Sequence, residues 1–252
     1  MRHAPRHPSN IAHELGHTPL VRSLPTPVRA IVFGASGALG GAFVEALSSD
    51  LEGALVVGLD RHSSPAFELE NEASIVACAH ELASHAPYAL MIDATGALTI
   101  DGNPPEKRLA ELDGHRLARA FEINAIGPAL LMKHFLPLLP AQGRCIFATL
   151  SARVGSIADN RKGGWYGYRA SKAALNMLLQ TAALETCRKR PDAVFLALQP
   201  GTVRSRLSDP FTARIATLDP RTSAALLLAV MDRAPATGAA AFLDHQGATV
   251  PW

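Results

Sequence analysis

The sequence has little of several features that mark specialised classes of protein. Only 3 of its 252 residues are cysteine, 6% are aromatic, and the formal net charge is +2. Cys78, Cys145 and Cys187 are far apart and odd in number. This excludes a disulfide framework and indicates free thiols in a reducing compartment. A nearly balanced charge gives no reason to expect a nucleic acid or a membrane surface as partner.

Long apolar runs and internal repeats are also missing. No apolar stretch reaches the roughly 20 residues that a membrane-crossing helix needs. The basic first residues are not followed by an apolar segment, so we expect no secretory signal. Together these absences predict a cytoplasmic protein with neither a membrane nor a nucleic-acid partner.

What the chain does have is material for one large core. Apolar residues make up 48% of it and charged residues 18%, a balance typical of a globular domain. Residues 1–27 are rich in His, Pro and Arg without apolar periodicity, so we expect a flexible N-terminal leader. Residues 28–252 are then expected to form one domain.

One metal motif lies in this leader. His13, Glu14 and His17 match H-E-x-x-H, in which two histidines on one helical turn bind zinc and the glutamate activates water. Against a zinc site, Gly16 and Pro19 oppose a helix, and no third ligand follows at a family spacing. A loose segment is the favoured interpretation, with a zinc hydrolase as the alternative.

Strand-like apolar runs alternate with helical patterns from residue 28 onward. This alternation predicts an α/β fold, a single Rossmann-type doubly wound parallel sheet with helices on both faces. The predicted strands cover 28–33, 55–59, 89–93, 144–150, 194–198 and 240–243. The predicted helices cover about 72–84, 113–139 (with a kink at Gly127-Pro128), 166–188 and 222–233, and one more follows the first strand.

A glycine-rich turn joins the first predicted strand to its helix. Glycines let the backbone approach a pyrophosphate, and the helix N-terminus presents free N–H groups to it. The turn therefore predicts dinucleotide binding by Gly34, Ser36, Gly37, Ala38, Leu39 and Gly40.

Asp60 and Arg61 follow the second predicted strand. Asp60 lies 20 residues past Gly40, where a carboxylate binds the ribose 2′-hydroxyl of NAD. Arg61 could instead hold the 2′-phosphate of NADP. We favour NAD, because the carboxylate repels phosphate and the glycine turn carries no basic residue.

Tyr168 and Lys172 stand four residues apart in a predicted helix. Residues at i and i+4 share a face, so phenol and ammonium can meet over one substrate. A nearby cation is expected to lower the tyrosine pKa and to make it a proton donor and acceptor near neutral pH. Tyr166 lacks such a partner, because Ala170 lies four residues after it.

Five residues follow predicted parallel strands: Gly34, Asp60, Gly96, Ser151 and Pro200. Ligands of such sheets bind at the carboxyl ends of the strands. We therefore expect these five positions to converge on one cleft.

Together these motifs resemble the short-chain dehydrogenase/reductase family, over nearly all of residues 28–252. The stretch from Leu150 to Ile157, the stretch from Gly163 to Lys172 and the ending Pro251-Trp252 resemble its C-factor and sniffer-type carbonyl reductase branch. The resemblance implies catalysis by Tyr168, Lys172, Asn124 and a serine. It also implies cofactor contacts from Tyr168, Lys172 and loop residues beyond the glycine turn: Glu68, Leu69, Ala94, Thr95, Gly96, Pro200, Gly201, Thr202 and Val203.

The serine departs from the family pattern. Its usual position, three residues before Gly155, is Ala152. Ser151 is one residue earlier, and a one-residue shift turns a side chain to the other face unless a bulge intervenes. Ser151 is the prediction, Ser156 the reserve, and a site without this serine stays open.

The resemblance implies hydride transfer between a nicotinamide and a small carbonyl or alcohol substrate. The alternative is a catalytically weak dinucleotide-binding signalling or regulatory protein. Residues 204–219 are expected to cover the substrate. Members of this family are usually dimers or tetramers, so the resemblance also implies a homodimer or homotetramer.

Overall fold

The computed structural model describes residues 21–50, 53–205 and 216–252. They form one six-stranded sheet in the order β2-β1-β3-β4-β5-β6, in which every neighbouring pair is parallel. The strands are β1 (Arg29–Phe33), β2 (Leu55–Leu59), β3 (Leu90–Asp93), β4 (Cys145–Leu150), β5 (Ala193–Gln199) and β6 (Ala240–Asp244). The α-helices are α2 (Ala38–Asp50), α3 (Glu72–Leu82), α4 (Gly114–Phe121), α5 (Gly127–Phe135), α6 (Tyr166–Cys187) and α7 (Pro220–Arg233).

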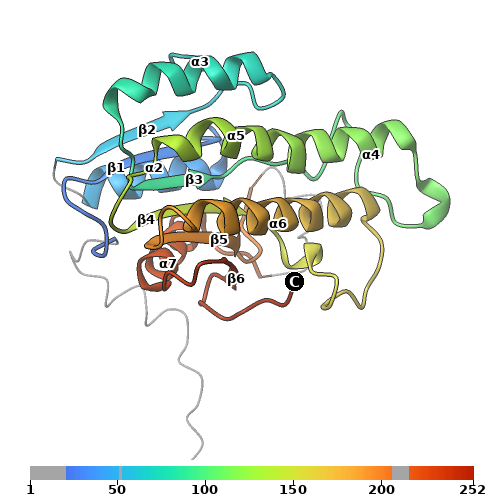
Figure 1. The fold of residues 1–252 in the computed structure, drawn as a ribbon. Coiled ribbons are helices and arrows are strands. Elements are labelled where there is room, and N and C mark those ends of the chain that lie inside the picture. Colours follow the sequence, from blue (N-terminus) through green and yellow to red (C-terminus); the bar gives the residue numbers. More distant parts are fainter. Residues whose placement is uncertain (1–20, 51–52, 206–215) are drawn as a thin grey trace, which may run out of the picture.

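Helices cover both faces of this sheet, which confirms the predicted fold. Figure 1 shows α3, α5 and α6 on one face, while α2 packs with α7 on the other. Successive strand residues alternate between the two layers: Ile31 and Phe33 join the core beneath α3, α5 and α6, whereas Ala30 and Val32 join the core beneath α2 and α7. Burial on both faces explains why the strands are continuous apolar runs.

The predicted long helix over 113–139 is interrupted earlier than expected. A π-helical turn, Glu122–Ile126, separates α4 from α5 and comes just before the predicted kink at Gly127-Pro128. Such turns inside α-helices occur frequently at functional sites. Asn124 lies in this one and is fully buried.

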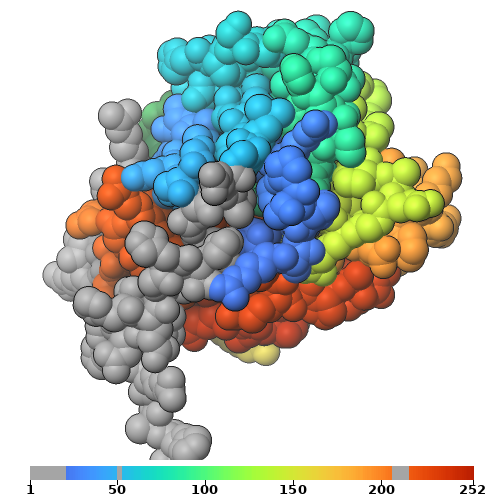
Figure 2. Space-filling view, turned by 90° about the vertical axis from the view of Figure 1, so that its left-hand side faces the viewer, coloured from blue at the N-terminus to red at the C-terminus, as the bar shows by residue number. Residues whose placement is uncertain are grey.

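The start of the described chain is packed rather than loose. Val21 and Leu24 are buried among the side chains beneath α2 and α7, and the backbone N–H of Ser23 donates to Asp232 at 2.7 Å. Figure 2 shows this blue segment lying between the cyan and green elements above it and the red C-terminal elements below. The predicted flexible leader therefore does not extend to residue 27; residues 1–20 lie outside the described part.

The three cysteines are free, as the sequence indicated, and all three are buried. Within the described ranges, none of the helices combines the length and the apolar composition needed to cross a membrane.

Candidate active site

The ends of β1, β3 and β4 meet in one region, which confirms that the sheet brings those motifs together. Gly34 lies against the backbone of Ala94, since a Cβ on Gly34 would be 3.0 Å from the Ala94 carbonyl oxygen. Gly96 lies against Lys172 in the same way, and the ammonium of Lys172 donates to the carbonyl of Leu150. The end of β5 lies beside the end of β4, because Ser151 N donates to Leu198 O.

The glycine turn is built for a close approach to a ligand. Gly34 has a φ of +77°, which favours glycine, and a Cβ on Gly40 would lie only 2.1 Å from the Gly34 carbonyl oxygen. Ser36, Gly37 and Ala38 are exposed at the start of α2. The N–H of Gly37 donates to Gly34 O. A phosphate could reach the other N–H groups at this helix start, so the residues present fit a dinucleotide.

Asp60 follows β2 directly, in the predicted place. Its Oδ1 accepts from His62 N at 2.7 Å, and its backbone is tied to the Ser63 hydroxyl. Arg61 beside it is exposed, and no carboxylate of the described residues pairs with it. The carboxylate and the guanidinium thus both lie at the end of β2.

The chain passes from β2 to α3 without another strand in between. Glu68 is exposed in this connection, where its backbone N–H donates to the Ser74 hydroxyl. Leu69 packs against Gly127 instead, where a Cβ on the glycine would lie 2.6 Å from Leu69 Cγ. Leu69 therefore contacts the π-helical region, while Glu68 stays at the surface.

Asp93 fixes the turn after β3. Its two carboxylate oxygens accept from Thr95 Oγ1 at 2.5 Å and from Thr149 Oγ1 at 2.6 Å, so it joins β3 to β4. Gly96 in this turn has a φ of +131°, and a Cβ there would lie 2.9 Å from Asn124 Oδ1 and 3.1 Å from Lys172 Nζ. Both the backbone conformation and the close approach require glycine.

Asn124 holds the same turn from the other side. Its amide makes two hydrogen bonds of 2.9 Å with the backbone of Ala97, one accepting from N–H and one donating to C=O. The π-helical turn thus aims a buried amide at the loop after β3.

Lys172 is the buried cation of the site. Its side chain is only 3% exposed, and Nζ donates to Leu150 O at 2.9 Å. Burial lowers the pKa of Lys172 to about 8, although the carboxylate of Asp93 raises it in part. This ammonium therefore titrates much closer to neutral pH than an exposed lysine does.

Tyr168 differs from the sequence-based expectation. Removal from water raises its pKa to about 12, which is the opposite of the expected lowering by Lys172. Among the described residues, no hydrogen bond joins the two side chains, because Nζ is directed at Leu150 O. Sharing a helix face does not by itself bring ammonium and phenol into contact.

Ser151 points toward α6. The β4–β5 register continues without a bulge to the Leu150–Leu198 pair, so Ser151 stays on the side of Phe147 and Thr149. Its hydroxyl donates to Asn176 Oδ1 at 2.6 Å. Asn176 is eight residues beyond Tyr168, which is about 12 Å along the helix axis.

Ser156, the reserve, is engaged elsewhere. Its hydroxyl accepts a hydrogen bond from Asp159 N at 3.0 Å and donates one to Trp252 O at 3.4 Å. It therefore joins the loop after β4 to the C-terminal segment.

The loop after β5 carries Pro200, Gly201, Thr202 and Val203. The Pro200 carbonyl accepts from the Ser223 hydroxyl at 2.8 Å, which ties the loop to α7. Arg204 and Leu218 pair through their backbones, so the two ends of the expected substrate cover lie together. Most of that cover, residues 206–215, is outside the described residues.

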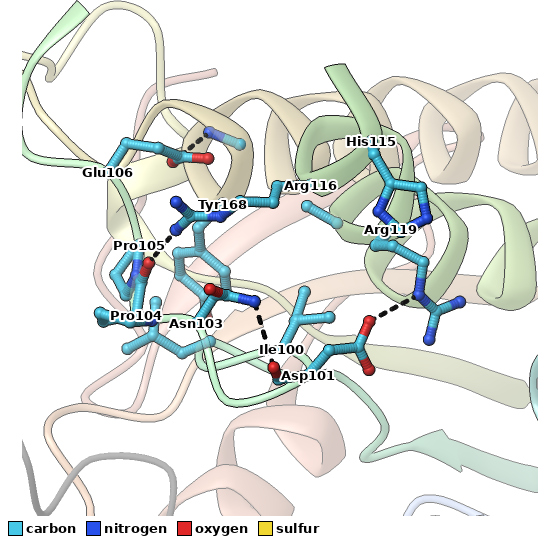
Figure 3. Close-up of a pocket in the computed structure, with 13 residues that line it drawn as sticks. Ile100, Asp101, Asn103, Pro104, Pro105, Glu106, His115, Arg116, Arg119 and Tyr168 are labelled. Atoms are coloured by element: carbon cyan, nitrogen blue, oxygen red, sulfur yellow. Dashed lines mark hydrogen bonds and ion pairs between the residues drawn. The ribbon is translucent and has the colours of Figure 1, made fainter. Parts of the chain in front are cut away.

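A cavity of about 100 Å³ opens beside Tyr168. One wall is a tight hairpin in which Ile100 and Asn103 pair across Asp101 and Gly102, both of which have positive φ as in a type I′ turn. Figure 3 shows Tyr168 between this loop and the side chains of α4. The lining consists of Leu98, Ile100, Asp101, Asn103, Pro104, Pro105, Glu106, His115, Arg116, Arg119, Ala120, Gly167 and Tyr168.

Two arginines of α4 hold the hairpin in place. Arg116 donates to Pro104 O at 2.5 Å, and Arg119 pairs with Asp101 at 3.0 Å. Arg119 also pairs with Glu70 and Glu122, so three carboxylates, Asp101 foremost, raise its pKa above the usual value.

The metal motif stays untested, because His13, Glu14 and His17 lie outside the described residues. In the part of the chain that is described, no three His, Cys, Asp or Glu side chains gather as metal ligands.

The sequence patterns assigned no role to three polar residues of this region: Asp93, Glu106 and Asn176. Each acts across the fold, on Thr149, Gly167 and Ser151 respectively. Asp93 could have been predicted most readily, because it ends a predicted strand and strand ends line ligand sites in this class of sheet.

Known proteins resemble this chain in sequence. The family model described as enoyl-(acyl carrier protein) reductase matches residues 66–250. The C-signal protein of Myxococcus xanthus is 37% identical over 145 residues, which cover 57% of this chain and 83% of that protein.

Two solved structures share the fold. One is a short-chain dehydrogenase/reductase of Burkholderia multivorans with bound NADP, with a TM-score of 0.76 and 24% identity over 89% of this chain and 99% of that one. The other is the carbonyl reductase Sniffer of D. melanogaster, with a TM-score of 0.74 and 19% identity over the same shares of the two chains.

Proposed function

Because the chain belongs to the short-chain dehydrogenase/reductase family, we propose that it transfers a hydride between a nicotinamide and a small carbonyl or alcohol substrate. The observation that carries this proposal is the set of groups around Gly96. Lys172 and Asn124 come from α6 and the π-helical turn to Gly96 at the end of β3, beside a glycine turn that fits a dinucleotide. Tyr168 lies one helical turn before Lys172 and lines the neighbouring cavity.

In the proposed reaction Tyr168 is the general acid and base. It protonates the carbonyl oxygen in reduction and takes the hydroxyl proton in oxidation. The bound nicotinamide supplies or accepts the hydride. Because burial holds the Tyr168 proton tightly in the protein alone, the phenol is a donor in the resting state, and release of its proton needs added positive charge nearby.

In this proposal Lys172 supplies that charge when its ammonium turns from Leu150 O toward the phenol, and it also holds the nicotinamide ribose. Its contact with Leu150 O keeps the ammonium at the strand ends. Asn124 orders the turn after β3 and the water through which protons reach Lys172. The hydrogen bonds of Asn124 to Ala97 support the ordering role.

We propose that the cofactor is held by the glycine turn from Gly34 to Gly40, by the turn Ala94-Thr95-Gly96 and by residues 200–203. The Asp60 carboxylate favours NAD, because it accepts a ribose hydroxyl and repels a 2′-phosphate. Exposed Arg61 and the NADP in the Burkholderia relative support the alternative, NADP. Glu68 and Leu69 complete the adenine side.

The serine is the open member of the proposed set. Ser151 can donate to a substrate oxygen only if its hydroxyl no longer donates to Asn176 Oδ1. Rotation of the Asn176 amide would allow this, because Nδ2, which is buried without a partner among the described residues, would then donate to Ser151 Oγ. Without that rotation Ser151 stabilises α6, and the reaction proceeds without a serine donor.

The decisive test is cofactor oxidation or reduction, followed by absorbance, across aldehydes, ketones and quinones. Tyr168→Phe should abolish turnover and leave the cofactor Kd unchanged, and turnover that survives would overturn the proposal. Tyr166→Phe is the matched control, since Tyr166 starts the same helix but lacks a lysine four residues on.

A second candidate is a dinucleotide-binding signalling protein with weak catalysis. The 37% identity to the C-signal protein and the alanine at position 152 favour it. It predicts tight cofactor binding with no turnover on any substrate class, and an unchanged response when Tyr168 is replaced.

We also propose self-association as a homodimer or homotetramer. Ile126, Met177, Leu178 and Leu184 are exposed apolar side chains on the π-helical turn before α5 and on α6, which favours a partner there. Light scattering of the wild type and of Met177→Glu would test this, since a charge at the contact should release monomers.

A further inference from the structure

The start of α6 has no cap of its own. The residue before the helix is Trp165, which has a left-handed φ of +54° and makes no side-chain cap hydrogen bond. Gly163 and Gly164 before it also have positive φ. The chain therefore turns sharply just before Tyr168, and the first N–H groups of the helix need acceptors from elsewhere.

Glu106 supplies these acceptors from a loop 61 residues away. Its carboxylate Oε2 accepts from Gly167 N at 3.1 Å, and its backbone carbonyl accepts from Trp165 N. One residue thus caps two N–H groups of the turn that carries Tyr168. Figure 3 shows the carboxylate of Glu106 reaching back to that backbone.

The fit between Glu106 and the helix is tight. Glu106 is only 4% exposed, although it is a carboxylate. A Cβ on Gly167 would lie 3.2 Å from Glu106 Oε1 and 3.3 Å from Leu117 Cδ2. The missing side chain of Gly167 therefore allows the loop to sit directly on the helix start.

Neighbouring contacts fix both partners. Arg116 binds the carbonyl of Pro104, two residues before Glu106. On the helix side, Arg169 donates to the carbonyls of Gly163, Gly164 and Val154. The contact between Glu106 and Gly167 is therefore held by fixed elements on each side.

We propose that Glu106 is the positioning residue for Tyr168. It sets the position of the phenol by acting as the hydrogen-bond acceptor for the first turn of α6. This inference rests on the proposed function, because it takes Tyr168 as the acid and base of the reaction. Glu106 itself touches neither substrate nor cofactor in this proposal.

Two substitutions separate the acceptor from the charge. Glu106→Gln keeps the length and an acceptor oxygen but removes the charge, whereas Glu106→Asp keeps the charge but is one methylene short. We expect Gln to retain kcat within about threefold. Asp should lower kcat at least tenfold, since small displacements of reacting groups cost up to about 100-fold in rate. The KM for cofactor should stay within about twofold for both.

Glu111→Ala is the matched control. Glu111 also caps a backbone N–H in this loop, that of Lys107, but the hydrogen bonds of its carboxylate go to Lys107 and Arg108 and not to α6. It should leave kcat unchanged. If Glu106→Gln loses activity and Glu106→Asp retains it, the charge matters rather than the position of the acceptor, and the proposal is overturned. Unchanged kcat in both variants would overturn it as well.

A second readout does not depend on activity. In a Trp252→Phe background, Trp165 is the only tryptophan, and its emission reports the helix start. Glu106→Asp should shift this emission and Glu106→Gln should not. If the wild type turns over no substrate while this pattern appears, the proposed function fails and the capping geometry stands. If the wild type is active and the emission of all variants is the same, the positioning inference fails.

Discussion

The ammonium of Lys172 lies 2.9 Å from the backbone carbonyl of Leu150 and makes no hydrogen bond to the phenol of Tyr168 among the described residues. A buried cation held by a neutral carbonyl is costly, because the carbonyl repays only part of the lost hydration. The residue with the clearest catalytic signal therefore destabilises the fold near neutral pH.

Replacement of this lysine should make the protein more stable and inactive. The pKa of about 8 lies about 2.5 units below the ordinary value of 10.5, so the charged form costs on the order of 3 kcal/mol. We expect Lys172→Met to raise the free energy of unfolding by about 1–3 kcal/mol at pH 7. The gain is smaller than the full cost of the charge, because the Leu150 carbonyl loses its donor. Urea titration measures this, with exposed Lys189→Met as control. A destabilised Lys172→Met would contradict the prediction.

That advantage should shrink as pH rises. Between about 8 and 10.5 the unfolded chain holds the lysine proton and the folded chain does not, so wild-type stability rises with pH in this window. Lys172→Met lacks this slope. Urea titrations at several pH values within the window should bring the two proteins together, and parallel curves would argue against the depressed pKa.

Activity should fall as pH rises through about 8. The proposed mechanism needs protonated Lys172, whose proton is lost near that pH, while the Tyr168 pKa of about 12 lies outside the working range. The pH profile of kcat/KM is the measurement, because it reports groups of the free enzyme. A profile that rises through pH 8 would assign the titration to a group needed in its deprotonated form.

Ala152→Ser should increase kcat. Position 152 is where the family resemblance expects the serine, and the backbone there is extended. Removal of one such donor costs other enzymes roughly 100- to 1000-fold, so about a tenfold gain is a conservative expectation. Ser151→Ala is the comparison, and if Ser151 only braces α6 it should lower kcat less than tenfold. A large loss there with no gain at 152 would restore Ser151 as the donor.

Asp60 should decide the cofactor preference. Asp60→Ala removes the carboxylate that favours a ribose hydroxyl, so the ratio of kcat/KM for NADH over NADPH should fall about tenfold or more. Arg61→Ala should change the same ratio in the opposite direction. Initial rates with both cofactors measure this ratio. If neither variant changes it, the adenine ribose does not bind at this strand end.

The strands and their common edge were predictable because each is a short apolar run, and Gly34, Asp60, Ser151 and Pro200 directly follow four of them. Parallel strands end on one side of a sheet, so these residues could be brought together without knowing any contact. The π-helical turn was not predictable in detail. Gly127-Pro128 signalled an irregular helix, but the interruption forms before it, where Asn124 is buried against the loop after β3.

The finer parts of the site depend on distances that no spacing encodes. Tyr168 and Lys172 share a helix face, but the direction of Nζ follows from where the Leu150 carbonyl lies. The orientation of Ser151 follows from an unbroken strand register, which the pattern at 144–151 left open. Glu106 acts across 61 residues, and nothing in its local sequence indicates α6.

Arg119 gives the pocket an evolutionary constraint. One guanidinium serves the hairpin through Asp101, the connection after β2 through Glu70 and the π-helical turn through Glu122. Any single replacement of the arginine leaves three acids facing one another, and any single replacement of an acid leaves the other two in place. A change of Arg119 must therefore arise together with changes in these acids, whereas Ile100 makes its hydrogen bonds through the backbone alone and can vary by itself. In the proposed function, new substrate preferences should accordingly arise at Ile100 rather than at Arg119.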